Sequence, residues 1–258
     1  MGTSPPNRAK GADAPKTGER SAARLGRRIG VKEIEAATSA GMRAQLGPAL
    51  YGERRVRLHK AILLDRDGII NDMVYYPDPG LVDSPFTPKQ FVLVEGVGQA
   101  LRTIRAAGYK LVLVSNQPSV AKKHMTMAAF KKIQAKMRRL LAAEGVRLDA
   151  EYYCFHHPQA RLAAYRADCA CRKPKPGMLL DAARSLGLDL GRSVMIGDGL
   201  YDVMAGRRAG CKTILVASLN ATLGRKMDEL GAHPDFVARN ISEAADIVKG
   251  LAPEITSR

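Results

Sequence analysis

The sequence predicts an α/β fold in which helices cover both faces of a doubly wound parallel sheet. Short apolar runs at 60–65, 109–116, 192–198 and 212–217 are typical of buried strands, and each ends in small or polar residues. Helical patterns lie between these runs, and strands that alternate with helices form parallel sheets with right-handed crossovers. We therefore expect a Rossmann-like architecture, in which ligands bind at the carboxyl ends of the strands.

The expected helices are identified by their apolar spacing. Residues 97–108 carry apolar side chains on one face, and segments 177–186 and 201–209 supply two further helices. Segment 126–143 begins at Thr126, a typical N-cap residue, and presents one apolar stripe with Lys and Arg opposite it. The stripe consists of Met127, Phe130, Ile133, Met137 and Leu140.

The chain of 258 residues is expected to hold one folded domain at 59–252. Residues 1–58 are rich in Gly, Ala, Pro and Arg and have weak periodicity, so we expect a basic, flexible extension. Residues 253–258 are expected to be a tail. A mitochondrial presequence is the alternative for the amino-terminal segment, but its glutamates count against this interpretation: Glu19, Glu33 and Glu35.

We expect no large cap domain. Such a domain could be inserted at 69–90 or at 117–171. The first segment is short and carries four prolines, so it is interpreted as a loop. The second is filled by the helix at 126–143, a strand and a cysteine-containing loop. The pocket is therefore expected to be open and walled by loops.

The net charge of +16 favours anionic partners, and part of it lies in residues 1–58, with 12 Lys and Arg against 5 Asp and Glu. Nucleic acid, anionic lipid and small phosphate esters all fit this excess. No apolar run approaches the ~18 residues of a membrane helix, and residues 1–30 lack the apolar region of a secretory signal. We expect a cytoplasmic protein with no membrane partner. Its oligomeric state is left open, and a monomer is compatible with the sequence.

Four residues predict a zinc site: Cys154, His156, Cys169 and Cys171. Cysteines clustered in a chain without a secretory signal indicate metal binding in a reducing compartment. Four protein ligands suit a closed, structural tetrahedral site, which leaves no position for a water. Spacing alone does not separate His156 from the adjacent His157. Because Cys171 directly precedes Arg172 and Lys173, the zinc loop at 154–171 is expected to fix where these cations point.

The first strand ends in Asp65-Arg66-Asp67-Gly68, which predicts phosphate chemistry. An EF-hand loop is a poor match, because its glycine belongs at the sixth position. A carboxylate that leaves a buried strand can attack phosphorus and form an aspartyl-phosphate. A second carboxylate two residues later can protonate the leaving group and then activate water.

The other parts of such a mechanism follow at later strand ends. Ser115 and Asn116 offer hydroxyl and amide groups to phosphoryl oxygens, and Arg172 and Lys173 offer cations. The carboxylates of Asp198 and Asp202 can hold Mg²⁺, which prefers one or two carboxylates together with waters and phosphate. The cation reduces the repulsion between an anionic nucleophile and an anionic phosphate.

The segments LLDRDG, VSNQ, CRKPKPGM and GDGLYD resemble, in order, the four motifs of haloacid dehalogenase-like (HAD) phosphatases. The resemblance implies that Asp65 is the nucleophile, Asp67 the acid/base, and Ser115 and Lys173 phosphate binders. It also implies that Mg²⁺ binds Asp65, the backbone carbonyl of Asp67, and Asp198, with Asp202 supporting.

The segment from Cys154 to Met178 is similar to the zinc loop of D-glycero-D-manno-heptose 1,7-bisphosphate 7-phosphatases and their histidinol-phosphate phosphatase relatives. This similarity favours His156 over His157 as the zinc ligand. Two positions depart from the heptose-phosphatase pattern. Gly199 stands where that family has Lys, and Pro118-Ser119 stands where it has Ser-Gly. Both departures bear on which sugar the protein recognises and leave the residues of the phosphatase chemistry intact.

The leading hypothesis is a Mg²⁺-dependent phosphomonoesterase that removes the 7-phosphate of heptose 1,7-bisphosphate. Histidinol phosphate or another small phosphate ester is the enzymatic alternative, and a polynucleotide 3′-phosphate is a further one. The chain lacks a basic stripe interleaved with aromatic residues, which counts against nucleic acid. A different class is a catalytically inactive zinc module that binds nucleic acid through the basic segment. Both aspartates of the first motif are present, which argues against inactivity.

Overall fold

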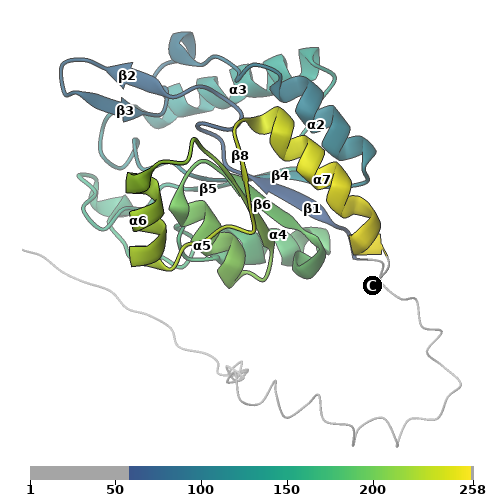
Figure 1. The fold of residues 1–258 in the computed structure, drawn as a ribbon. Coiled ribbons are helices and arrows are strands. Elements are labelled where there is room, and N and C mark those ends of the chain that lie inside the picture. The colour runs from purple at the N-terminus through teal and green to yellow at the C-terminus, as the bar shows by residue number, and fades with distance from the viewer. Residues whose placement is uncertain (1–57, 257–258) are drawn as a thin grey trace, which may run out of the picture. The chain divides into compact units, whose positions relative to one another are not determined.

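The computed structural model describes residues 58–256, and a six-stranded sheet in the order β5-β4-β1-β6-β7-β8 forms its centre (Figure 1). All neighbouring strands in this sheet are parallel, so the predicted α/β fold is confirmed. The strands are β1 (Ala61–Leu64), β4 (Lys110–Asn116), β5 (Ala150–Cys154), β6 (Val194–Gly197), β7 (Lys212–Val216) and β8 (Phe236–Ala238). The helices are α2 (Val97–Ala106), α3 (Met127–Ala143), α4 (Gly177–Leu186), α5 (Leu200–Arg208), α6 (Ala221–Leu230) and α7 (Ile241–Thr256).

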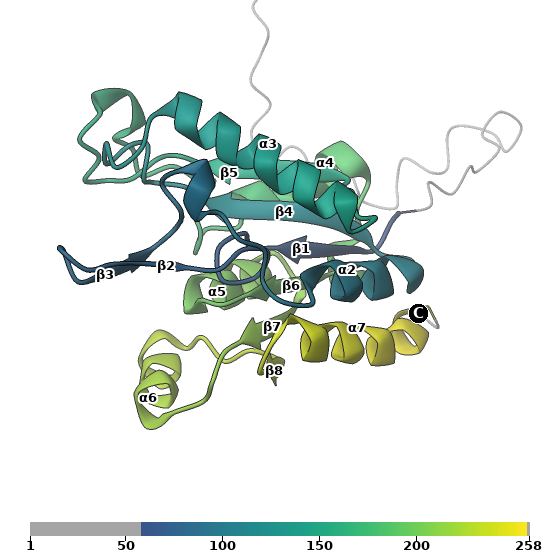
Figure 2. The same cartoon turned by 90° about the horizontal axis from the view of Figure 1, so that it is seen from above.

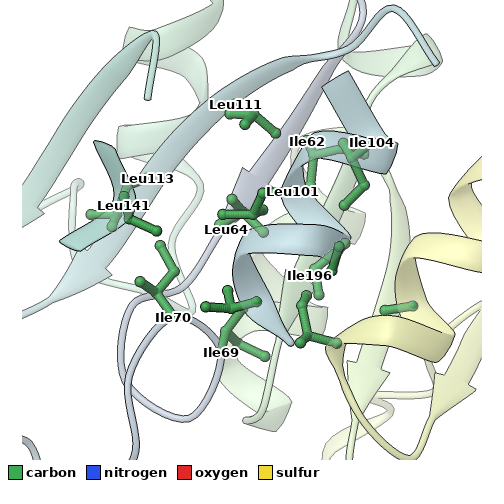
Figure 3. Close-up of a cluster of buried hydrophobic side chains, with 14 of the residues drawn as sticks. Ile62, Leu64, Ile69, Ile70, Leu101, Ile104, Leu111, Leu113, Leu141 and Ile196 are labelled. Atoms are coloured by element: carbon green, nitrogen blue, oxygen red, sulfur yellow. The ribbon is translucent and has the colours of Figure 1, made fainter. Parts of the chain in front are cut away.

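Helices cover both faces of the sheet (Figure 2). Along β1, Ile62 and Leu64 pack into a cluster with residues of α2, α3 and α7, part of which Figure 3 shows. Ala61 and Leu63 point to the other face and pack with residues of α4 and α5. Burial on both faces explains why β1 is a continuous apolar run. Each fully buried aliphatic side chain contributes about 1.5–3 kcal/mol.

Helix α3 begins as the sequence predicts. The Thr126 hydroxyl oxygen accepts a hydrogen bond from the Ala129 amide at 3.1 Å, which satisfies one of the free N–H groups at the helix start. Within the predicted stripe, the structure buries Phe130, Ile133 and Met137. Leu141, four residues after Met137, completes the buried face, whereas Leu140 is only partly buried.

The segment 69–90 differs from the expected loop, because part of it forms a hairpin. Strands β2 (Val74–Tyr76) and β3 (Leu81–Asp83) pair in antiparallel orientation. The 3₁₀ helix η2 (Pro88–Gln90) follows. Proline disfavours strand interiors, but these prolines lie in the hairpin turn and after β3 rather than in either strand.

The ends of the predicted domain are only partly covered by the structure. The expected extension at 1–58 lies almost wholly outside the described residues, and α7 continues to Thr256, past the predicted domain end at 252. Within residues 58–256, β2 and β3 are the only strands outside the main sheet, and no second domain is inserted. None of the described helices combines the length and the apolarity needed to cross a bilayer.

Candidate active site

Residues from four predicted motifs line one pocket of about 210 Å³ at the carboxyl ends of β1, β4 and β6. This is the edge at which parallel α/β sheets bind ligands. Residues as far apart in the sequence as Asp65 and Asp198 therefore meet in one pocket. The predicted residues in the wall are Asp65, Asp67, Asn116, Arg172 and Asp198.

Asp65 occupies the first position after β1 and is held through one carboxylate oxygen. Its Oδ1 accepts the Arg66 amide at 2.7 Å and the Lys173 ammonium at 3.0 Å. The other oxygen, Oδ2, has no hydrogen bond to the residues that the structure describes. The side chain keeps 16% of its surface exposed toward the pocket. One oxygen fixes the carboxylate, and the other is left for chemistry.

Gly68 allows the loop after β1 to approach Asp198. Its φ of +78° lies in the left-handed region that favours glycine. A Cβ atom built on Gly68 would lie 2.1 Å from Asp198 Oδ2, which is an overlap. The glycine of the DxDG motif is therefore required by both backbone conformation and space.

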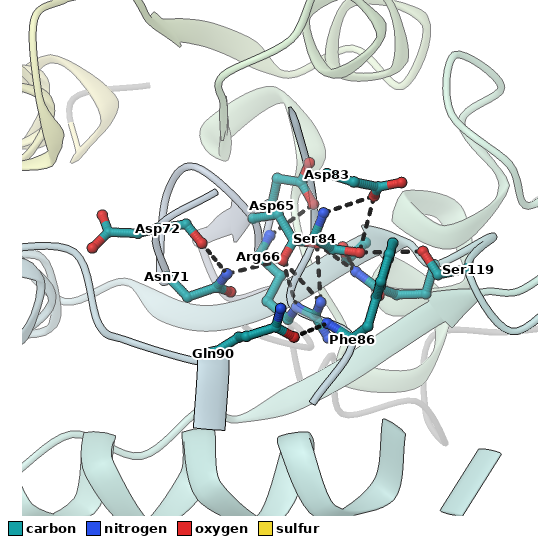
Figure 4. Close-up of polar contacts among 12 residues, drawn as sticks. Asp65, Arg66, Asn71, Asp72, Asp83, Ser84, Phe86, Gln90 and Ser119 are labelled. Atoms are coloured by element: carbon teal, nitrogen blue, oxygen red, sulfur yellow. Dashed lines mark hydrogen bonds and ion pairs between the residues drawn. The ribbon is translucent and has the colours of Figure 1, made fainter. Parts of the chain in front are cut away.

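Asp67 is surrounded by donors that the sequence did not single out, and Figure 4 labels two of them, Arg66 and Asn71. The Arg66 guanidinium donates to both of its carboxylate oxygens at 2.8 and 3.1 Å through Nη2. Asn71 donates to Oδ1 at 2.9 Å, and Gln117 donates to Oδ2 at 2.6 Å. Arg66 is fully buried, so these contacts fix Asp67 firmly. Strand alternation places Gln117 on the same side as Ser115, a signal that could have identified it.

Lys173 lies beneath the pocket with its side chain only 2% exposed. Its ammonium contacts Asp65 at 3.0 Å, Asp202 at 2.6 Å and the Val114 carbonyl at 2.8 Å. Burial disfavours the charged form, but Asp202 and Asp65 outweigh it and raise the pKa of Lys173. All three ammonium donors are used within the protein.

The two predicted phosphate-binding residues at the end of β4 differ in their access to the pocket. Ser115 is 1% exposed, and its hydroxyl accepts a hydrogen bond from Gln117 at 3.1 Å, so it lies behind the wall. Asn116 lines the pocket, but its amide is bound to the Lys173 backbone. It donates to the Lys173 carbonyl at 3.0 Å and accepts from the Lys173 amide at 3.1 Å. Asn116 thus fixes the position of Lys173 relative to β4.

Three carboxylates lie close enough together to bind one cation. Oxygens of Asp65, Asp198 and Asp202 lie within 4.8 Å of one another. Desolvation by the surrounding protein atoms, together with the negative charges of Asp65 and Asp202, raises the pKa of Asp198 to about 8. Its side chain nevertheless keeps contact with solvent. Like charges this close disfavour joint ionisation, and a divalent cation relieves the repulsion. The oxygen donors fit Mg²⁺.

The zinc ligands predicted from the sequence converge at the end of β5. The donor atoms of Cys154, His156, Cys169 and Cys171 lie within 4.8 Å of one another. Their Sγ–Sγ distances are 3.1–3.5 Å with no disulfide among them. Tetrahedral zinc with Zn–S bonds of about 2.3 Å separates sulfurs by about 3.8 Å, so a small outward shift accommodates the ion. Soft donors in this number fit Zn²⁺.

The structure separates the two adjacent histidines. His156 Nδ1 lies 3.8 Å from Cys154 Sγ and 3.5 Å from Cys171 Sγ. His157 lies outside this cluster, and its Nδ1 accepts the Gln159 amide at 3.1 Å. The Arg172 guanidinium donates to the His156 carbonyl at 3.1 Å, so the cysteine–histidine cluster is connected directly to a pocket cation.

Comparisons with known proteins agree with this fold and site. The HAD-hydrolase-like family model matches residues 170–244. D-glycero-beta-D-manno-heptose-1,7-bisphosphate 7-phosphatase of Pasteurella multocida is 39% identical over 196 residues, which cover 75% of this chain and 99% of that protein. The crystal structure of D,D-heptose 1,7-bisphosphate phosphatase from B. bronchiseptica, complexed with magnesium and phosphate, has a TM-score of 0.59 and 34% identity. The match covers 73% of this chain and 97% of the B. bronchiseptica chain.

A HAD-like phosphatase structure from Mesorhizobium loti matches with a TM-score of 0.62 and 31% identity, covering 77% of this chain and 88% of that one. The fold and the site thus define a phosphatase of the HAD-like class. Within this class, the chain belongs to the family of the heptose bisphosphate phosphatases.

Proposed function

We propose that this phosphatase hydrolyses a small sugar phosphate through an aspartyl-phosphate, with the 7-phosphate of D-glycero-D-manno-heptose 1,7-bisphosphate as its substrate. The observation that carries the proposal is the convergence of Asp65, Asp67 and Asp198 in one pocket above the buried Lys173. The similarity to phosphatases named for that sugar supports the choice of substrate.

In the first step, Asp65 Oδ2 attacks phosphorus while Oδ1 stays bound to Lys173 and the Arg66 amide. The P–O bond to the sugar breaks, and the sugar oxygen leaves with a proton from Asp67. In the second step, Asp67 takes a proton from water, and the water oxygen attacks phosphorus. Inorganic phosphate leaves and the Asp65 carboxylate is restored.

Asp67 must move to act as the acid. Both of its oxygens accept hydrogen bonds, and a proton donor needs one oxygen free. Oδ2 accepts one hydrogen bond from Gln117 and one from Arg66 Nη2, whereas Oδ1 accepts three, from Arg66 Nε, Arg66 Nη2 and Asn71, so Oδ2 is easier to release. Asp67 therefore turns its Oδ2 toward the leaving group while Arg66 retains the other oxygen.

Mg²⁺ would be held by Asp65, Asp198 and the backbone carbonyl of Asp67, with Asp202 in support. When bound, the ion lowers the repulsion between the anionic nucleophile and the anionic phosphate. Arg172 lines the same pocket and contributes a cation to the phosphoryl oxygens. Ser115 acts from behind the wall by orienting Gln117, and Asn116, in the wall itself, orients Lys173.

The substrate is tested by phosphate release from a panel of esters with Mg²⁺ and with EDTA. The panel holds heptose 1,7-bisphosphate, histidinol phosphate, other sugar phosphates and a 3′-phosphorylated oligonucleotide. We expect the highest kcat/KM on the heptose ester and a loss of activity with EDTA. A higher kcat/KM on histidinol phosphate or on the oligonucleotide would transfer the substrate assignment to that ester.

Zn²⁺ is proposed to act structurally at Cys154, His156, Cys169 and Cys171. We expect about one zinc per chain, and Cys169→Ser should lower both the zinc content and the activity, since Arg172 is bound to the His156 carbonyl. Metal analysis and phosphate release measure the two effects. Cys211→Ala is the matched control, because Cys211 is buried outside the cluster and its loss should leave zinc in place. A folded, active protein without zinc contradicts the proposal.

A reducing, cytoplasmic location is proposed together with this site. Its support is that the four cysteines of the described residues form no disulfide.

A further inference from the structure

Asp83 contributes a carboxylate to the active-site pocket from outside the four motifs. It is the last residue of β3 and lines the pocket together with Asp65, Asp67 and Arg172. The pocket volume of about 210 Å³ corresponds to a sphere about 7 Å across. Asp83 therefore faces the part of a substrate that lies within a few bonds of the reacting phosphate.

A chain of hydrogen bonds fixes Asp83 (Figure 4). Its Oδ1 accepts the Ser84 amide at 2.7 Å and the Ser84 hydroxyl at 3.1 Å. The Ser84 hydroxyl lies 3.2 Å from that of Ser119, and both serines are buried. Because an ionised carboxylate only accepts, the Ser84 proton points to Asp83, and Ser119 must then donate to Ser84. Each hydrogen bond in such a chain strengthens the next.

The hairpin that carries Asp83 is bound to the segment that directly follows it. The Tyr76 hydroxyl donates to the Ser84 carbonyl at 3.0 Å and accepts the Phe86 amide at 3.1 Å. The Tyr76 and Phe86 rings stack with centroids 4.4 Å apart. The carboxylate is thus set in place before a substrate arrives, which reduces the entropy lost on binding.

Only one carboxylate oxygen of Asp83, Oδ1, accepts hydrogen bonds from Ser84. Oδ2 has no hydrogen bond to the part of the chain that the structure describes, so it is free to accept one from a ligand. We propose that Asp83 is a specificity-determining residue that accepts a hydrogen bond from a hydroxyl of the sugar, and that Ser119 positions it through Ser84. This inference rests on the proposed function. Ser119 is also a position where the chain departs from the heptose-phosphatase pattern.

The test compares two esters of equal chain length, D-glucitol 6-phosphate and n-hexyl phosphate, on the full chain with Mg²⁺. The wild type should prefer the hydroxylated ester. Asp83→Asn keeps an oxygen for Ser84 but replaces the free carboxylate oxygen. It should lower the ratio of kcat/KM for the glucitol ester to kcat/KM for the hexyl ester about tenfold to a hundredfold, as for a hydrogen bond to a charged group.

Asp72→Asn is the matched control, because Asp72 is exposed on the same segment and is not in the pocket wall. It should change neither ester, which excludes a general effect of charge. Equal losses of Asp83→Asn on both esters, or no preference in the wild type, would overturn the proposal. Hydrolysis of neither ester would count against the proposed function and remove the basis of this inference with it.

Ser119→Ala tests the positioning role. It should raise KM for the glucitol ester about threefold without a change in kcat, since one neutral hydrogen bond in the chain is lost. The hexyl ester should show no change in KM. A fall in kcat on both esters would mean that Ser119 supports the fold of the site rather than the position of Asp83.

Discussion

Asp65→Asn should lower phosphate release by at least about 1,000-fold, equivalent to about 4 kcal/mol of transition-state stabilisation. The amide has the shape of the carboxylate, but it lacks the charge and the nucleophilic oxygen that the pocket presents. The variant should stay folded, because Lys173 keeps its ion pair with Asp202 at 2.6 Å and the loss of one charge reduces the repulsion near Asp198 and Asp202. Phosphate release and mass spectrometry of quenched reactions, which detects the phosphorylated wild type, measure the effect.

The control for this variant is Asp78→Asn, which removes the same charge from an exposed residue in the hairpin turn. Its activity should equal that of the wild type. If Asp65→Asn retains more than about a tenth of wild-type activity, the nucleophile is another group and the proposed mechanism is wrong.

Lys173→Met should lower the free energy of unfolding by about 3–5 kcal/mol, the usual cost of removing one partner from a buried ion pair. Methionine fills a similar volume but leaves Asp65 and Asp202 without their cation. Since natural domains are stable by only about 5–15 kcal/mol, the effect is a large part of the total. Activity should fall as well, because the position of Asp65 depends on this contact. Chemical denaturation and phosphate release measure both effects.

Two further variants make the Lys173 prediction specific. Adding Asp202→Asn to Lys173→Met should recover part of the stability without recovering activity, since it removes one of the two unpaired charges. Lys175→Met is the matched control. Lys175 pairs with Asp168 at 2.6 Å, but their side chains are 42% and 77% exposed, so the loss should be below about 1 kcal/mol. Equal destabilisation by Lys173→Met and Lys175→Met contradicts the argument.

The sheet and the motif residues could be predicted from the sequence because their signals are local. The run at 61–64 is apolar without interruption, which is typical of a strand buried on both faces. Asp65 follows it directly, so its place at the carboxyl edge follows from the chain direction alone. The cysteines were predicted from their spacing and His156 from the resemblance to the family's zinc loop, and the structure brings their donor atoms together.

The surroundings of these residues depend on contacts that no local pattern reports. Arg66 has the sequence character of a surface residue, and only the packing shows that it is buried against Asp67. Asp83 lies in a segment whose prolines indicated a loop, and its position in the pocket depends on Ser119, far along the chain. Such pairings depend on the folded arrangement, so sequence spacing could not predict them.

The close approach of Gly68 to Asp198 has a consequence for how this site tolerates change. A library of all substitutions at Gly68 should yield only glycine among active clones, because even a methyl group would overlap the Asp198 carboxylate. The pocket wall carries no such restriction at Met73, whose side chain is exposed. The site therefore combines a position next to Asp198 at which only glycine is tolerated with an exposed position at which substitutions can change the substrate preference.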